Sequence, residues 1–305
     1  MFAAPPIVKS EVYARLPDAL RKTETTASEW FQHQPGSLPP HSLLEGPSFD
    51  AQGNLYCVDI PWGRIFRIDT AGNFKLIAEY DGEPNGLKIH RDGRIFIADY
   101  KHGIMVLDPD SGTVTPYLAR VRLERLKAVN DLVFASNGDL YFTDQGLTGL
   151  HDATGRVFRV RGNGQIECLL DNVPSPNGLV LDPSESVLYL AVTRANAIWR
   201  VPLMRDGNVA KVGNFIQLSG GVGPDGLAVD EQGNLAIAHP GLGVVWLMSA
   251  RGEPMLRIDS CAGHHTTNIA FGGKDRRTLF ITESGTGQIL KAPMPVAGQV
   301  MFSGV

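Results

Sequence analysis

The phrase "PSPNGLVLD" at residues 174–182 joins an Asn-Gly pair to a run of alternating apolar residues. Nearly the same phrase returns as "EPNGLKIHRDG" at 83–93 and as "GPDGLAVDEQG" at 223–233. An Asn-Gly pair often forms a tight hairpin turn, because both residues tolerate a positive φ angle. The recurrence, however, indicates an internal repeat, and a repeat of this length decides the fold.

Aligned on this phrase, the chain divides into six similar segments whose first residues lie 40 to 48 positions apart. Each segment holds a short apolar strand, a turn rich in Asp and Gly, a second strand such as "LYCVDI" or "RIFIADY", and further strands with period-two patterning. Four antiparallel strands in roughly 45 residues, repeated six times, predict an all-β fold, the six-bladed β-propeller. The blades are expected to start near Glu45, Asn85, Asn130, Asn177, Asp225 and Asn268.

We expect residues 1–305 to form one propeller domain that residues 1–44 help to close. The sixth segment ends after "QILKAPM" without a fourth strand, whereas "SEVYARLPDAL" at 10–20 resembles the fourth strands of the other segments. The N-terminal segment is therefore predicted to complete the last blade and to cover its exposed edge. The Pro-rich stretch 34–42 is expected to be a connector, with a helix in part of 21–32 as an alternative.

Composition excludes several classes of partner. The net charge of -4 provides no positive field for nucleic acid or an anionic membrane. Three widely spaced cysteines without a C-x-x-C pattern predict buried, reduced thiols. The start of the chain lacks the features of a secretion signal, and no apolar stretch reaches the roughly 20 residues that cross a bilayer. A cytoplasmic location is expected, and the sequence predicts no particular oligomeric state.

The residue before each innermost strand should lie on the rim of the central channel. All six residues at this position carry side-chain oxygens, two as carboxylates and four as carboxamides. Turn formation alone is the alternative reading, although it would admit Ser or Pro freely and would disfavour Glu. Converging oxygen ligands are typical of a hard cation such as Ca²⁺. The rim set is Glu45, Asn85, Asn130, Asn177, Asp225 and Asn268.

The phrases "LLEGPSFD", "AVNDLVF", "PSPNGLVLD" and "GPDGLAVD", in this order, resemble the SMP-30/gluconolactonase/luciferin-regenerating-enzyme (LRE)-like family of six-bladed propellers. The likeness extends over nearly the whole chain. It implies a divalent metal, most often Ca²⁺ with Zn²⁺, Mg²⁺ or Mn²⁺ as alternatives, and it implies lactone hydrolysis. It also implies that Asp131 is a second acidic residue near the metal, and that the metal ligands are Glu45, Asn130, Asn177 and Asp225. Relatives that resemble the aldonolactonase carry Arg at the position of Ala128.

Lactone hydrolysis needs an electrophile at the carbonyl and a base that activates water. Asp225 is the expected base, Asp131 competes for this role, and a nucleophilic carboxylate is a further alternative. Loops between second and third strands share the face of the rim and should form the wall of the substrate pocket. Arg194 could bind an anionic group or lie on the surface, and Trp62 could stack on a ring or cover a blade edge. The expected substrate-binding residues are Asn85, Trp62, Tyr100, His102, Gln145, Arg194, His265 and Asn268, with Lys101, His239, His264 and Glu283 nearby.

Three functions remain open from the sequence. The leading prediction is a metal-dependent lactonase that acts on a small-molecule lactone. A phosphotriesterase or organophosphate hydrolase on the same site is the second, and a non-catalytic propeller that binds calcium or a ligand is the third. No G-x-S-x-G elbow and no phosphate-binding glycine loop occurs, which argues against a serine hydrolase and a nucleotide-binding protein.

Overall fold

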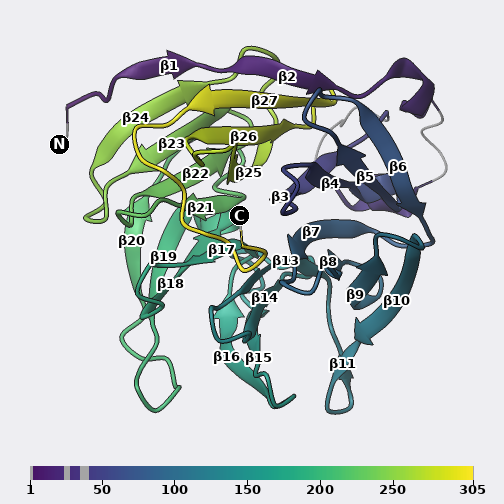
Figure 1. Ribbon diagram of the computed structural model, residues 1–305. Coiled ribbons are helices and arrows are strands. Elements are labelled where there is room, and N and C mark those ends of the chain that lie inside the picture. The colour runs from purple at the N-terminus through teal and green to yellow at the C-terminus, as the bar shows by residue number, and fades with distance from the viewer. Residues whose placement is uncertain (1–2, 24–27, 35–40, 305) are drawn as a thin grey trace.

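The protein is a ring of six sheets, built mainly from antiparallel strands, around a central channel (Figure 1). The computed structural model describes residues 3–23, 28–34 and 41–304. The predicted all-β, six-bladed propeller is confirmed. From the channel outward, the first four blades are β3 (Leu44–Phe49), β4 (Leu55–Asp59), β5 (Arg64–Ile68), β6 (Phe74–Glu79); β7 (Pro84–Ile89), β8 (Ile95–Asp99), β9 (Gly103–Asp108), β10 (Thr113–Leu118); β13 (Val129–Phe134), β14 (Leu140–Asp144), β15 (Gly155–Val160), β16 (Ile166–Val173); and β17 (Pro176–Leu181), β18 (Val187–Val192), β19 (Ala197–Pro202), β20 (Gly213–Gln217).

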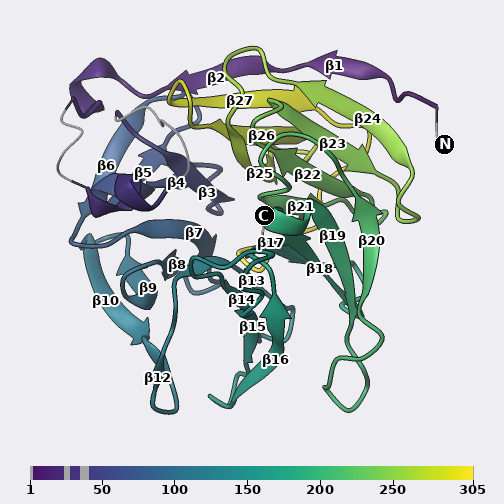
Figure 2. The same cartoon turned by 180° about the vertical axis from the view of Figure 1, so that it is seen from behind.

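The N-terminal segment closes the ring as predicted. The fifth blade contains β21 (Leu227–Val229), β22 (Leu235–His239), β23 (Val244–Met248) and β24 (Pro254–Asp259), and the sixth contains β25 (Thr266–Gly272), β26 (Thr278–Glu283) and β27 (Gln288–Pro293). Strand β2 (Glu11–Arg15) pairs with β27 in antiparallel register and completes the sixth blade. Strand β1 (Ile7–Lys9) also pairs with β24 in parallel, which the sequence analysis did not predict. One N-terminal stretch therefore spans the outer edges of two blades (Figures 1 and 2).

The hydrophobic core lies between neighbouring blades. Val58 and Ile65 of the first blade form one buried cluster with Leu87 and Ile97 of the second. In the first five blades the second strand is buried along its whole length, because both of its faces pack against adjacent sheets. Each fully buried aliphatic side chain contributes about 1.5–3 kcal/mol. Blade-to-blade packing is thus the main source of stability.

Several expectations for the ends and the cysteines need correction. Cys168 is exposed on the outer strand β16, whereas Cys57 is buried, and all three cysteines are unpaired. Among the described residues of 21–32, the helical alternative is seen as the short 3-10 helix η2 (Glu29–His33), and a further 3-10 helix, η1 (Asp18–Leu20), lies just before this range. Residues 24–27 and most of the predicted connector, 35–40, lie outside the described residues. Among the residues that the structure describes, no helix is long and apolar enough to span a bilayer.

The Asn-Gly pairs are not turns, which corrects the simplest interpretation of the motif. Asn177 and Gly178 lie inside the inner strand β17, and Gly178 is not among the residues with positive φ. A Cβ atom on Gly178 would lie 2.4 Å from the carbonyl oxygen of Asp225 in the next blade. Glycine is therefore required because the inner strands approach one another closely around the channel.

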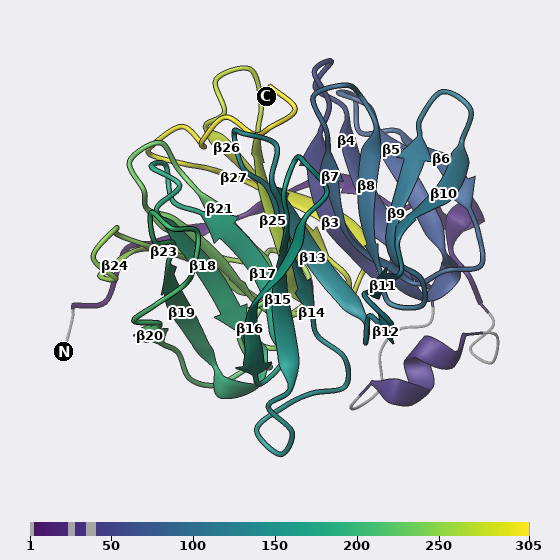
Figure 3. The ribbon, with the colours of Figure 1, turned by 90° about the horizontal axis from the view of Figure 1, so that it is seen from below.

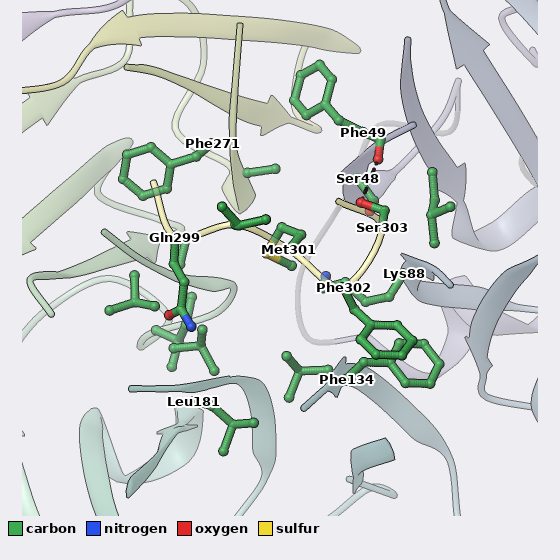
Figure 4. A pocket seen from close by; sticks show the side chains of 18 of the residues that line it. Ser48, Phe49, Lys88, Phe134, Leu181, Phe271, Gln299, Met301, Phe302 and Ser303 are labelled. Atoms are coloured by element: carbon green, nitrogen blue, oxygen red, sulfur yellow. Dashed lines mark hydrogen bonds between the residues drawn. The ribbon is translucent and has the colours of Figure 1, made fainter. Parts of the chain in front are cut away.

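The two faces of the ring differ. Inner strands begin at one face, called here the entrance face, where η2 also lies; the C-terminal tail crosses the channel at the opposite face (Figure 3). In the tail, the ring of Phe302 stacks on Phe134 at a centroid distance of 5.0 Å, and the Ser303 hydroxyl donates to the Phe49 carbonyl. The tail covers a cavity of about 340 Å³ whose walls come from the inner strands (Figure 4).

Candidate metal centre

Irregular pairing turns the rim residues toward the channel. In five of the inner strands the register with the second strand breaks at the rim residue or beside it, and such bulges redirect side chains. Asp225 lies just before β21 and is half-buried. The other five rim side chains are buried: Glu45, Asn85, Asn130, Asn177 and Asn268.

Three carboxyl groups are close enough at the rim to influence one another. Burial, followed by the charge of Asp131, raises the pKa of Glu45 to about 8. Burial and then the charges of Glu45 and Asp131 raise the pKa of Asp225 well above its ordinary value, while a hydrogen bond with Asn177 and the charge of Arg194 oppose this. Three crowded carboxylates are costly unless a proton or a cation compensates them.

The side-chain amide of Asn130 is held with its oxygen available. Its Nδ2 atom donates to Tyr100 Oη at 3.0 Å and to Gln145 Oε1 at 3.0 Å. Tyr100 Oη also donates to Gln145 Oε1, and Gln145 Nε2 donates to Ser175 Oγ at 2.9 Å. Tyr100 and Gln145 both contact the amide nitrogen of Asn130. No hydrogen bond from another described residue reaches Asn130 Oδ1, so this oxygen could ligate a cation.

Asn268 has a different arrangement from Asn130. Its Nδ2 atom donates to Glu45 Oε2 at 2.7 Å, and its Oδ1 atom accepts from the backbone N–H of Ile269 at 2.8 Å. Both ends of this amide are therefore used. Glu45 Oε2 also accepts from the Gly46 N–H at 2.7 Å, so Asn268 orients the Glu45 carboxylate.

Hydroxyl groups on the second strands support the rim, and the sequence analysis missed them. Thr143 Oγ1 accepts from the Asp131 N–H at 3.0 Å and donates to the Asn177 carbonyl at 2.9 Å, which joins two blades. Thr282 Oγ1 accepts from the Asn268 N–H at 2.9 Å in the sixth blade. The available signal was a Thr before the acidic residue that ends each of these strands, in "LYFTD" and "LFITE".

Acidic residues that end second strands have structural roles. Asp144 accepts from the Lys127 and Ala128 N–H groups at 2.7 and 2.9 Å and pairs with Arg156. Glu283, expected near the pocket, is fully buried and accepts from the backbone N–H of His265 at 3.1 Å. These carboxylates hold the loops on the entrance face in place.

His239 is also structural. It is fully buried, its Nδ1 atom accepts from Trp246 Nε1 at 3.2 Å, and its Nε2 atom lies 3.0 Å from the Gly220 carbonyl. Burial lowers the pKa of His239. A neutral imidazole with both nitrogens engaged is not positioned to carry protons for a substrate.

The remaining candidates lie in loops on the entrance face, outside the buried rim set. The ring of Trp62 packs at a centroid distance of 6.3 Å from Phe31 of η2, which favours a covering role. His102 bonds to the Asp81 carbonyl, and Lys101 pairs with the Asp81 carboxylate at 2.9 Å. The other three differ in exposure and contact: Arg194 and His264 are exposed, and His265 lies beside Gly285.

The donor set fits a hard cation. In the described part of the chain, no group of three His, Cys, Asp or Glu side chains is arranged as a metal cluster, so a cation here would need amide oxygens. Asp131 raises the pKa values of both Glu45 and Asp225 by its charge, which shows that these three carboxyl groups lie near one another. The free amide oxygen of Asn130 adds a neutral donor. Carboxylate and amide oxygen donors suit a divalent hard ion.

Fold and rim together define a propeller with an oxygen-lined centre at one mouth of its channel. The family model described as "SMP-30/Gluconolactonase/LRE-like region" matches residues 43–285. The chain belongs to this family, as the sequence phrases indicated.

Named relatives agree with this assignment. The Lactonase drp35 of Staphylococcus saprophyticus is 31% identical over 245 residues, which are 76% of this chain and 73% of the relative. A lactonase is a hydrolase of carboxylic esters, and the predicted enzyme class is confirmed at this level.

Two solved structures share the fold. A calcium-binding protein, regucalcin, from Agrobacterium tumefaciens superposes with a TM-score of 0.78 at 23% identity, covering 98% of each chain. A gluconolactonase from Xanthomonas campestris has a TM-score of 0.73 at 24% identity, covering 83% of this chain and 86% of that one. At these identities the likeness concerns the fold.

Proposed function

We propose that this protein hydrolyses a small-molecule lactone at a divalent-cation centre, with Ca²⁺ as the metal. The ligands would be Glu45, Asn130, Asn177 and Asp225. The observation that carries the proposal is the convergence of acidic groups whose pKa values rise through burial and mutual repulsion, next to an amide oriented with its oxygen free. Lactonase relatives at 31% identity support the reaction class.

A bound cation would polarise the lactone carbonyl as a Lewis acid. Asp225, or alternatively Asp131, takes a proton from water, and the water oxygen attacks the carbonyl carbon. The ring C–O bond then breaks, and the proton passes to the leaving alkoxide oxygen, which yields the hydroxy acid. Tyr100 and Gln145 keep Asn130 oriented during these steps. Arg194, exposed on the same face, is available to an anionic substituent of the substrate.

A panel of lactones tests this function. Ring opening should be lost with EDTA and restored by Ca²⁺, and paraoxon should be a poor substrate. Turnover of paraoxon without lactone hydrolysis would favour a phosphotriesterase, and Ca²⁺ binding without either turnover would favour a binding protein. A cytoplasmic location and a lack of nucleic-acid or membrane partners remain predictions of the sequence.

A further inference from the structure

Lys88 is a cation placed inside the channel. It lies on the inner strand β7, and its side chain is only 12% exposed. The six inner strands, β3, β7, β13, β17, β21 and β25, contain no other Lys, Arg or His. Three residues after the rim position, the first five blades have Ser48, Lys88, Val133, Val180 and Ala228. The channel is otherwise small or apolar at this level, so the ammonium needs a specific explanation.

The partner of Lys88 is Asp131 of the next blade. Lys88 Nζ lies 3.7 Å from Asp131 Oδ1 and donates to the Leu87 carbonyl at 3.2 Å, and the Asp131 side chain is 3% exposed. A Cβ atom on Gly86 would lie 2.5 Å from Asp131 Oδ1, so this glycine makes room for the carboxylate. Two residues of β7 therefore accommodate Asp131: Gly86 leaves space for the carboxylate, and Lys88 pairs with its charge.

The charge of Lys88 also reaches the rim. It lowers the pKa of Glu45, against the larger effects of burial and Asp131. Glu45, Asp131 and Asp225 carry three negative charges when ionised, and one ammonium leaves two. Loss of Lys88 would leave the buried Asp131 carboxylate without its ion-pair partner, which destabilises the folded state. The positive charge of Lys88 therefore belongs to the charge balance of the rim.

We propose that Lys88 is a positioning residue that anchors Asp131 and matches the net charge of the rim to a divalent, rather than a trivalent, cation. This inference rests on the proposed function, because it concerns the same centre. A lysine that merely paired with an aspartate at a channel surface would influence stability but not the preference between ions of different charge.

The test compares Ca²⁺ with Tb³⁺ as probes of the purified full chain. Removal of one positive charge should favour binding in proportion to the charge of the ion. We expect Lys88→Met to bind Ca²⁺ about tenfold more tightly and Tb³⁺ about thirtyfold more tightly, measured by calorimetry and Tb³⁺ luminescence. Lys88→Arg should stay near the wild-type values. Lys75→Met, which removes an exposed lysine on the outer strand β6, should change neither affinity.

An unchanged ratio of the two dissociation constants in Lys88→Met, or an equal shift in Lys75→Met, overturns the role of Lys88. If Lys88→Met does not fold, Lys88→Gln carries the same expectation. A wild-type chain that binds neither ion at millimolar concentration rejects the proposed metal centre instead. Binding to the wild type with an unchanged ratio rejects only the inference about Lys88.

Discussion

The carboxylates and amides of the rim have unequal roles, although the sequence presents them as equivalent. Asn130 keeps an oxygen free because Tyr100 and Gln145 hold its nitrogen, whereas both ends of the Asn268 amide are hydrogen-bonded. Asn85 is buried, and no hydrogen bond joins its side chain to another described residue. The rim therefore contains ligand candidates such as Asn130 together with an orienting residue, Asn268.

Removal of one rim carboxylate should abolish turnover without unfolding the protein. We expect Asp225→Asn and Glu45→Gln each to lower kcat/KM for a lactone by about a thousandfold or more, since each would lose charge at the cation. The melting temperature without metal should stay the same or rise, because repulsion is relieved. Wild-type rates in either variant would contradict the site assignment.

Stabilisation by Ca²⁺ should increase with pH. Folding raises the pKa of Glu45 from 4.5 to about 8, so the folded state holds the proton more tightly than the unfolded state. Without metal, the contribution of Glu45 to stability is therefore greatest below pH 4.5 and falls as the pH rises from 4.5 to about 8. The shift of melting temperature on adding Ca²⁺ should be larger at pH 8 than at pH 5.5, and smaller and flatter in Glu45→Gln. A pH-independent shift in the wild type would argue against a Ca²⁺ site at Glu45.

At the scale of the strands, the glycine after the rim residue reflects packing between blades. Gly178 lies against Asp225 of the next blade, and Gly226 lies against Asn268 of the sixth. A residue with a side chain at these positions would push neighbouring inner strands apart. The motif thus combines a polar side chain for the centre with an empty space for the adjacent blade.

Gly178→Ala should destabilise the fold, because its Cβ atom would lie 2.4 Å from a backbone oxygen. We expect a loss of about 1–3 kcal/mol in the free energy of unfolding, measured by urea denaturation. Gly162→Ala is the matched control, since a Cβ atom there meets nothing within 4 Å and φ is not positive. Equal stability of the two variants would show that close approach of the blades is not the reason for Gly178.

At the scale of the whole molecule, the two termini close the ring in different ways. The N-terminal strands cover the edges of two blades, and the C-terminal tail crosses the channel. The tail contacts several blades: Phe302 packs against His90 and Phe134, Gln299 N–H donates to Val229, and Ser303 donates to Phe49. The tail thereby joins distant parts of the ring at the face opposite to the candidate centre.

A chain truncated before Gln299 should be less stable but should keep its site. We expect the melting temperature to fall by roughly 2–6 °C, as for a loss of about 1–3 kcal/mol in a protein of this size. The kcat per folded molecule should remain near the wild-type value, because the tail and the rim lie on opposite faces (Figure 3). Phe302→Ala should reproduce part of the loss. Inactivity of a stably folded truncated protein would show that the tail acts on the centre.

The fold and the rim residues could be predicted because both repeat with the period of the blades. Strand patterning and one polar residue per repeat are local features, and they recur six times in "PSPNGLVLD" and its counterparts. The fourth strand of the last blade could be found for the same reason, since "SEVYARLPDAL" resembles its equivalents.

The direction of each amide, the pairing of Lys88 with Asp131, the neutral His239 and the tail across the channel have no such period. Each depends on contacts between residues that are distant in the chain or lie in different loops. The chain's repeats specify a ring with oxygen donors at one mouth. The packing of one blade against the next decides which donors remain free and how their charge is balanced, because those contacts exist only once the ring has closed.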